Sequence, residues 1–180
     1  MLVQGEAEAP RVDVSARVPG RVVELGADVG DRVEQGALLV RLENAQLTTN
    51  LGAAQAALEQ SLRYVEERKQ FGKAIGEFQA LQHRAAQLYI DIEITRAAVL
   101  KALQALDTDL DKAAHAVAVA KARAGTTATL AVQEGVQMHG GMGMTDQFDI
   151  GFFMKRARVC QELFGDSNFH TDQLASGKGY

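Results

Sequence analysis

The sequence has one cysteine, two prolines and no tryptophan among its 180 residues. A single cysteine, Cys160, excludes an internal disulfide framework and a cysteine-rich zinc site. The 19 basic residues are outnumbered by 23 acidic ones, so the basic face that duplex nucleic acid requires is not expected. No run approaches the ~18 apolar residues of a membrane span, and residues 1–10 lack the basic start and apolar run that are typical of a signal peptide. We expect a cytoplasmic protein that binds neither nucleic acid nor membrane.

The composition is that of a folded protein, with 47% hydrophobic and 23% charged residues. At about 150 residues per domain, the length predicts one domain or two small ones. The period of the hydrophobic pattern changes once, near Gln46. We therefore expect two domains, a small β unit in residues 1–47 and a helical domain in residues 48–180.

Residues 10–43 alternate between apolar and polar side chains, which is typical of strands with one buried face. The alternation runs through Val12, Val14, Ala16 and Val18, resumes at Val23 and Leu25, and returns at Leu38, Val40 and Leu42. Turns are predicted at Pro19-Gly20, Gly30-Asp31 and Gln35-Gly36, because glycine reaches positive φ and proline presets a turn. The pattern predicts four short strands.

From Gln46 onward apolar residues recur at steps of three and four, the period of an amphipathic helix. Helices are expected over residues 46–71, 78–107, 109–140 and 146–164, with a short one after Ser167. Asp107 or Asp109 can cap the third helix, and Gly140-Gly141 can end it. The predicted fold class is mainly α, an up-and-down four-helix bundle with a small N-terminal β unit.

The segment Gly30-Asp31-Arg32-Val33-Glu34-Gln35-Gly36 and its flanks, about residues 9–47, resemble the first half of a biotinyl/lipoyl-like domain, a half barrel-sandwich hybrid. The resemblance is closest to the periplasmic adaptor proteins of bacterial secretion and efflux. Gln46 stands where carrier domains have their modified lysine, and a glutamine amide is not a nucleophile. A swinging-arm role is not expected. Two interpretations of this segment stay open: a truncated β unit without a function of its own, and a component similar to the adaptor proteins.

Residues of about 52–175 resemble the C-terminal helical domain of the acyl-CoA dehydrogenases. Three segments carry the resemblance, in family order and spacing: residues 64–83, 131–143 and 156–170. The resemblance implies a flavoprotein oxidoreductase of fatty acid metabolism that acts on the CH–CH bond of acyl-CoA thioesters. It also implies FAD as the cofactor, acyl-CoA as a ligand, and a homo-oligomer, either a dimer or a tetramer.

The same resemblance implies that seven positions contact FAD, partly across a subunit interface. They are Arg68, Phe71, Gln79, Gln137, Gly140, Gly141 and Ser167. A guanidinium can bind a pyrophosphate with two hydrogen bonds, amides can donate and accept at a nucleobase, and glycine lets a ligand approach the backbone. Without the resemblance, the favoured interpretation is that Arg68 is a solvated charge at a helix end and that the two glycines only end a helix.

The family's usual catalytic glutamate, the general base, aligns with Gly165, which has no side chain to accept a proton. Asp166, one residue later, and Glu43, near the alternative base position of some relatives, are the remaining candidates. The other two domains that form the family's pocket do not occur in these 180 residues. We expect the chain alone to be inactive. The alternative function is a non-catalytic helical protein that dimerises or binds a partner.

The four histidines, His83, His115, His139 and His170, lack the spacing of a zinc site, so no metal is expected. Cys160 lies on an apolar helix face without a nearby basic pair, and we expect a buried thiol rather than a nucleophile.

Overall fold

The computed structural model of the protein describes residues 21–43, 46–177 and 179. The strand predicted before residue 20 and the Pro19-Gly20 turn lie outside these residues. The elements in chain order are β1 (Arg21–Leu25), β2 (Val40–Glu43), α1 (Gln46–Glu67), β3 (Lys69–Gln70), β4 (Lys73–Ala74), the 3-10 helix η1 (Ile75–Glu77), α2 (Gln79–Thr108), α3 (Leu110–His139), the 3-10 helix η2 (Gly140–Met144), α4 (Ile150–Glu162) and α5 (Ser167–Ser176).

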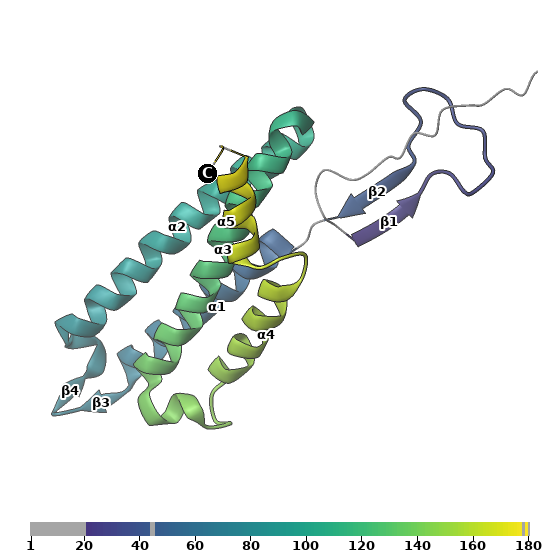
Figure 1. Cartoon of the computed structure of the whole chain (residues 1–180). Helices are drawn as coiled ribbons and strands as arrows, with labels where there is room; N and C mark the ends of the chain where they lie inside the picture. The colour runs from purple at the N-terminus through teal and green to yellow at the C-terminus, as the bar shows by residue number, and fades with distance from the viewer. Residues whose placement is uncertain (1–20, 44–45, 178, 180) are drawn as a thin grey trace, which may run out of the picture.

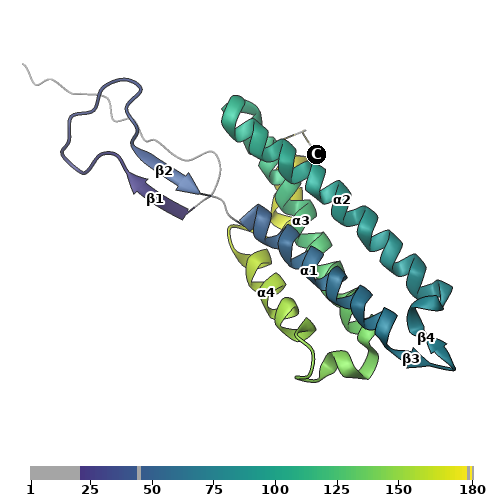
Figure 2. The ribbon, with the colours of Figure 1, turned by 180° about the vertical axis from the view of Figure 1, so that it is seen from behind.

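Helices α1 to α4 form the up-and-down bundle that the sequence predicts, and α5 packs against α3 (Figures 1 and 2). The direction of each helix follows from the contacts at its ends. Thr95 of α2 bonds Thr127 of α3 while Arg84 pairs with Glu134, so α2 and α3 are antiparallel. Lys121, early in α3, bonds the end of α4 at Cys160, so α4 runs back along α3.

The predicted stop signals between the long helices are confirmed. The Asp109 carboxylate accepts a hydrogen bond of 3.3 Å from the Lys112 amide and so caps α3. Gly140 ends α3 with φ of 58°, a conformation that favours glycine. α1 ends at Glu67 rather than near residue 71, because the chain after it forms the β3–β4 hairpin in which Lys69 pairs with Ala74.

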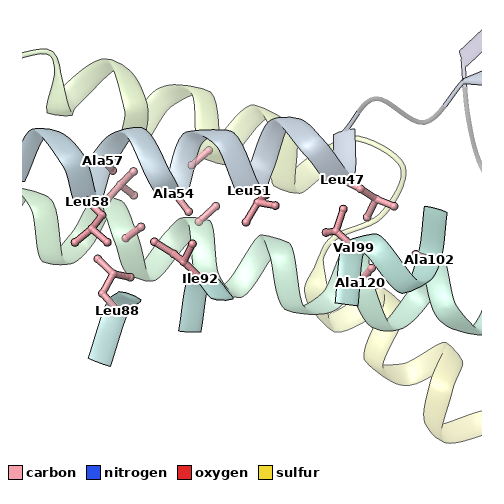
Figure 3. Packing of buried hydrophobic residues seen from close by; sticks show 14 of the residues in the cluster. Leu47, Leu51, Ala54, Ala57, Leu58, Leu88, Ile92, Val99, Ala102 and Ala120 are labelled. Atoms are coloured by element: carbon pink, nitrogen blue, oxygen red, sulfur yellow. The ribbon is translucent and has the colours of Figure 1, made fainter. Parts of the chain in front are cut away.

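The core of the bundle consists of aliphatic side chains at the predicted helical spacing. Leu51 and Leu58 of α1 face α2, where Leu88 and Ile92 are buried (Figure 3). On α3 the facing positions are mostly alanines and valines, such as Ala120 and Ala128. These small side chains let α3 lie close to its neighbours, and α3 occupies the centre of the bundle, packing against α1, α2, α4 and α5.

The N-terminal hairpin differs from the prediction. β1 and β2 pair antiparallel, with Arg21 opposite Glu43 and an irregularity between Val22 and Glu24. The two predicted turns that lie within the described residues, at Gly30-Asp31 and Gln35-Gly36, are present, and Gly30 and Gly36 have φ of 100° and 87°. The expectation of a buried face is wrong for β1, because Val23 and Leu25 are 45% and 70% exposed. The hairpin projects beside the start of α1, and none of the described residues forms a second layer over it (Figures 1 and 2).

Substitution by alanine should have opposite effects on stability at two glycines of the bundle. A Cβ on Gly135 of α3 would stand 2.5 Å from Ile150 Cδ1 and 3.0 Å from Ser61 Oγ, both in fully buried side chains. We expect Gly135→Ala to lower the free energy of unfolding by about 1–3 kcal/mol through overpacking. Gly52, exposed on α1 with no atom within 4 Å of such a Cβ, is the matched control. Gly52→Ala should stabilise by about 0.4–1 kcal/mol. Equal urea midpoints for the two variants would contradict this.

Candidate functional site

Arg68 directly follows α1, at the end of the bundle where the β3–β4 hairpin begins. Its amide donates to the Tyr64 carbonyl at 2.9 Å, and its own carbonyl accepts from the Ile75 amide at 2.8 Å. The backbone at Arg68 is therefore fixed from both sides. The side chain is exposed, and no carboxylate among the described residues forms an ion pair with it. An exposed guanidinium on a fixed backbone can bind an anion.

Phe71 lies at the tip of the β3–β4 hairpin with its ring 91% exposed. Its φ of 56° is unusual for a residue with a side chain and indicates strain that the hairpin maintains. The Phe71 and Phe78 rings are nearly perpendicular, with 6.1 Å between their centroids, and Lys73 lies over the Phe78 ring at 4.3 Å. Gln79 begins α2 beside this hairpin and is also exposed.

The turn after α3 is open to solvent. Gly140 and Gly141 are exposed, and no atom lies within 4 Å of the place where either would carry a Cβ. Gln137, in the last turn of α3, is exposed beside them. These two glycines form a backbone surface that a side chain would fill, and it suits close approach by a ligand.

Three aromatic rings connect the end of α1 with the end of α3. Tyr64 stacks on His139 with 4.3 Å between centroids and an interplanar angle of 21°. Phe148 meets both rings edge-on, at 5.1 Å and 5.2 Å. His139 Nδ1 lies 2.7 Å from the Gly135 carbonyl oxygen, and burial lowers the pKa of the imidazole despite this bond. The cluster joins the segment that carries Arg68 to the turn that carries Gly140.

The α4–α5 turn contains the aligned position of the family base. Gly165 has φ of 92°, and a Cβ there would stand 2.5 Å from the Phe169 ring. The Asp166 carboxylate accepts a hydrogen bond of 2.8 Å from the Phe169 amide, so it caps α5. This bond explains the position of Asp166 without a catalytic role. The side chain of Glu43 lies outside the described part of the structure.

Two buried basic side chains, Lys121 and His170, hold this turn in place. Lys121 Nζ donates to the Cys160 and Leu163 carbonyls at 2.9 and 2.8 Å, and His170 Nε2 donates to the Phe164 carbonyl at 3.0 Å. Burial lowers the pKa of Lys121, an effect that Cys160 opposes. Burial also lowers the pKa of His170, which the bond to Phe164 opposes and the Lys121 charge reinforces.

The structure places six of the seven predicted FAD residues at one end of the bundle, around the end of α1, the start of α2 and the end of α3. Ser167 is apart from them, because its hydroxyl lies against Gly125, at the middle of α3 and 15 residues before Gly140. Sequence reasoning missed Tyr64 and Lys121. A signal for Lys121 exists, since it falls four residues after Val117 and three before Ala124, both buried.

Residues 39–178 match the family described as acyl-CoA dehydrogenase, C-terminal domain. The chain belongs to the acyl-CoA dehydrogenase family through this domain. It is 34% identical over 160 residues to the acyl-CoA dehydrogenase IpdE2 of Mycolicibacterium smegmatis, covering 87% of this chain and 47% of that protein. The chain thus spans about half the length of this relative.

Solved structures give the same result. A glutaryl-coenzyme A dehydrogenase in complex with glutaryl-CoA superposes with a TM-score of 0.70 at 29% identity, over 74% of this chain and 34% of that one. The steroid ACAD Tcur3481-Tcur3483 superposes with a TM-score of 0.70 at 30% identity, over 76% of this chain and 38% of that one. These similarities favour the interpretation as an acyl-CoA dehydrogenase domain over the interpretation as an adaptor protein. They also support FAD as the cofactor, by resemblance.

The remaining negative findings concern membranes and metals. None of the helices in the described ranges is long and apolar enough to cross a membrane. The same residues contain no group of three or more histidine, cysteine or acidic side chains that could hold a metal ion.

Proposed function

We propose that this chain supplies the FAD-binding helical domain of an acyl-CoA dehydrogenase. The single observation that carries the proposal is an exposed guanidinium, with no ion-pair partner among the described residues, together with an open di-glycine turn at one end of the bundle. Arg68 would bind the pyrophosphate, Gln79 and Gln137 would bind polar edges of the adenosine, and Gly140-Gly141 would admit it to the backbone. Bound FAD would supply the acceptor for a hydride from an acyl-CoA thioester.

The chain would contribute binding rather than proton abstraction. Gly165 offers no carboxylate, and the Asp166 carboxylate is occupied as a helix cap. We propose that the base comes from another polypeptide or another part of the assembly. The name of the similar steroid ACAD joins two designations, Tcur3481 and Tcur3483, which favours a heteromeric arrangement as the second candidate. In it, this chain would be the subunit without a base.

A titration tests the FAD proposal. The isolated chain should bind FAD with a Kd of roughly millimolar, or −4 kcal/mol, because only the adenosine-side contacts are made. Arg68→Ala should abolish this binding, since the glycines alone do not offset the desolvation of two phosphates. Arg63→Ala, which removes another exposed arginine of α1, is the matched control and should leave binding unchanged. NMR shifts mapped on Gly140 measure both. Shifts that are absent from Gly140, or unaffected by Arg68→Ala, would refute the proposal.

The proposed assembly is at least a dimer, and we expect the isolated chain to self-associate. Large apolar side chains on the outer face of α2 are exposed, with Tyr89 at 57%, Ile90 and Ile94 each at 50%, and Leu100 at 54%. Exposed apolar side chains at helical spacing favour an interface. Light scattering at tens of micromolar should give at least twice the monomer mass, and Ile90→Lys should reduce it. A monomer at all concentrations would contradict the expectation.

We make a separate proposal for the role of the N-terminal hairpin. The antiparallel pair β1–β2, joined by a long connection with turns at Gly30 and Gly36, is compatible with the first half of a biotinyl/lipoyl-like fold. With its apolar side chains exposed, this hairpin would serve as a docking element for a partner rather than as a carrier.

A further inference from the structure

We propose that His139 is a positioning residue, which acts through its flat ring to hold the Arg68 segment and the Gly140-Gly141 turn in a fixed relation. The inference deepens the proposed FAD function and rests on it for its binding readout. His139 is the last residue of α3, directly before Gly140, and it is 2% exposed. Tyr64, on which it stacks, lies one helical turn before Arg68. Tyr64 thus lies four residues before Arg68, and His139 lies directly before the Gly140-Gly141 turn.

The hydrogen bonding of His139 indicates that ring shape matters more than polarity. A backbone carbonyl only accepts, so Nδ1 must carry the proton that bonds the Gly135 oxygen at 2.7 Å. Nε2 is buried and has no hydrogen-bond partner among the described residues. The imidazole is therefore neutral and makes one local bond within its own helix. Its contacts to other elements are made by the ring faces and edges, to Tyr64 and Phe148.

Close packing around His139 leaves little room for another arrangement. A Cβ on Gly143 would stand 2.9 Å from the His139 Cβ, so η2 lies directly against this residue. Phe148 closes the cluster from the chain segment before α4. The ring consequently separates and fixes three segments: the end of α1, the turn after α3 and the segment that leads to α4. Removing the ring would free the first two from each other.

Hydrogen exchange in the ligand-free chain tests the positioning directly. Two reporter amides are those of Ile75, bonded to the Arg68 carbonyl, and Thr145, bonded to the Met142 carbonyl. His139→Ala should accelerate exchange at both by at least tenfold, and His139→Phe, which keeps a flat ring, should change it by less than threefold. Val99→Ala is the control, because it opens a smaller space in the buried core at the other end of the bundle (Figure 3). It should leave both reporters within threefold of wild type.

FAD titration of the same proteins supplies the functional readout. His139→Ala should weaken FAD binding at least tenfold, and His139→Phe should restore it to within threefold of wild type. If wild type binds no FAD, the proposed function fails, while the exchange data still decide the positioning. Tyr64→Leu removes the opposite ring and should reproduce the exchange pattern of His139→Ala, which covers the case in which His139→Ala does not fold. Unchanged reporters in Tyr64→Leu, or a His139→Phe protein that behaves like His139→Ala, would overturn the inference.

Discussion

Replacing Ile92 with alanine should lower the free energy of unfolding by about 2–5 kcal/mol. Ile92 lies in the middle of α2, is 2% exposed, and belongs to the cluster that α1, α2 and α3 share (Figure 3). The substitution removes three carbon atoms from a packed interior, and the stiff neighbouring helices collapse only partly into the space. A domain of this size has a total stability of about 5–15 kcal/mol, so one substitution removes a large share.

Ile94 is the matched control, because it has the same side chain two residues later on the same helix and is 50% exposed. Ile94→Ala should change the unfolding free energy by less than about 0.5 kcal/mol at low protein concentration. Urea denaturation measures both variants, with the slope m expected to stay constant while the midpoint falls for Ile92→Ala. Similar midpoints for the two variants would show that α2 packs on a different face from the one described.

Acidification should destabilise the bundle well before most carboxylates are protonated. His139 and His170 are both 2% exposed, and burial lowers the pKa of each in the folded chain. In the unfolded chain they bind protons near their ordinary pKa of about 6.5. The unfolded state therefore takes up more protons as the pH falls below about 6.5, down to the lowered folded pKa values. Stability should fall by at most about 2.7 kcal/mol per pH unit in this window, and the two histidines should add no further pH dependence above it.

Urea denaturation at pH values between about 5 and 8 measures this dependence. His139→Phe removes one titrating group and keeps the ring, so it should halve the slope below pH about 6.5. A profile that is level across the whole range would contradict the prediction. So would a slope of the opposite sign, because it would require the histidines to be more readily protonated in the folded chain.

The helices were predictable because their signals are local. Asp109 as a cap and Gly140 as a stop are each determined by the backbone conformation at one position, and both lie where the sequence indicates. The buried face of β1 was not predictable from Val23 and Leu25, because alternation shows that one face is apolar and does not show that another layer covers it. The two-domain division at residue 47 stays a prediction.

The sequence predicted which residues belong to the candidate site, but not how they are arranged in space. The resemblance pointed to Arg68 and Gly140, but the stack of Tyr64 on His139 that joins their segments depends on the tertiary arrangement of α1 and α3. Likewise, the sequence allowed Asp166 as a base, while the structure shows its carboxylate bonded to the Phe169 amide. Roles that depend on which partner a side chain finds in space could not be obtained from spacing.

The single residue between α2 and α3 has a consequence for how the chain folds. Because Asp109 alone joins two 30-residue helices, bringing them together closes almost no loop, and the entropic cost of that step is small. The α2–α3 pair is thus the natural nucleus, and α1 and α4 add to it from either side. Contacts between α1 and α4 span far more of the sequence and form late. We therefore expect the stack of Tyr64 on His139, which joins α1 to the di-glycine turn, to form after the α2–α3 pair.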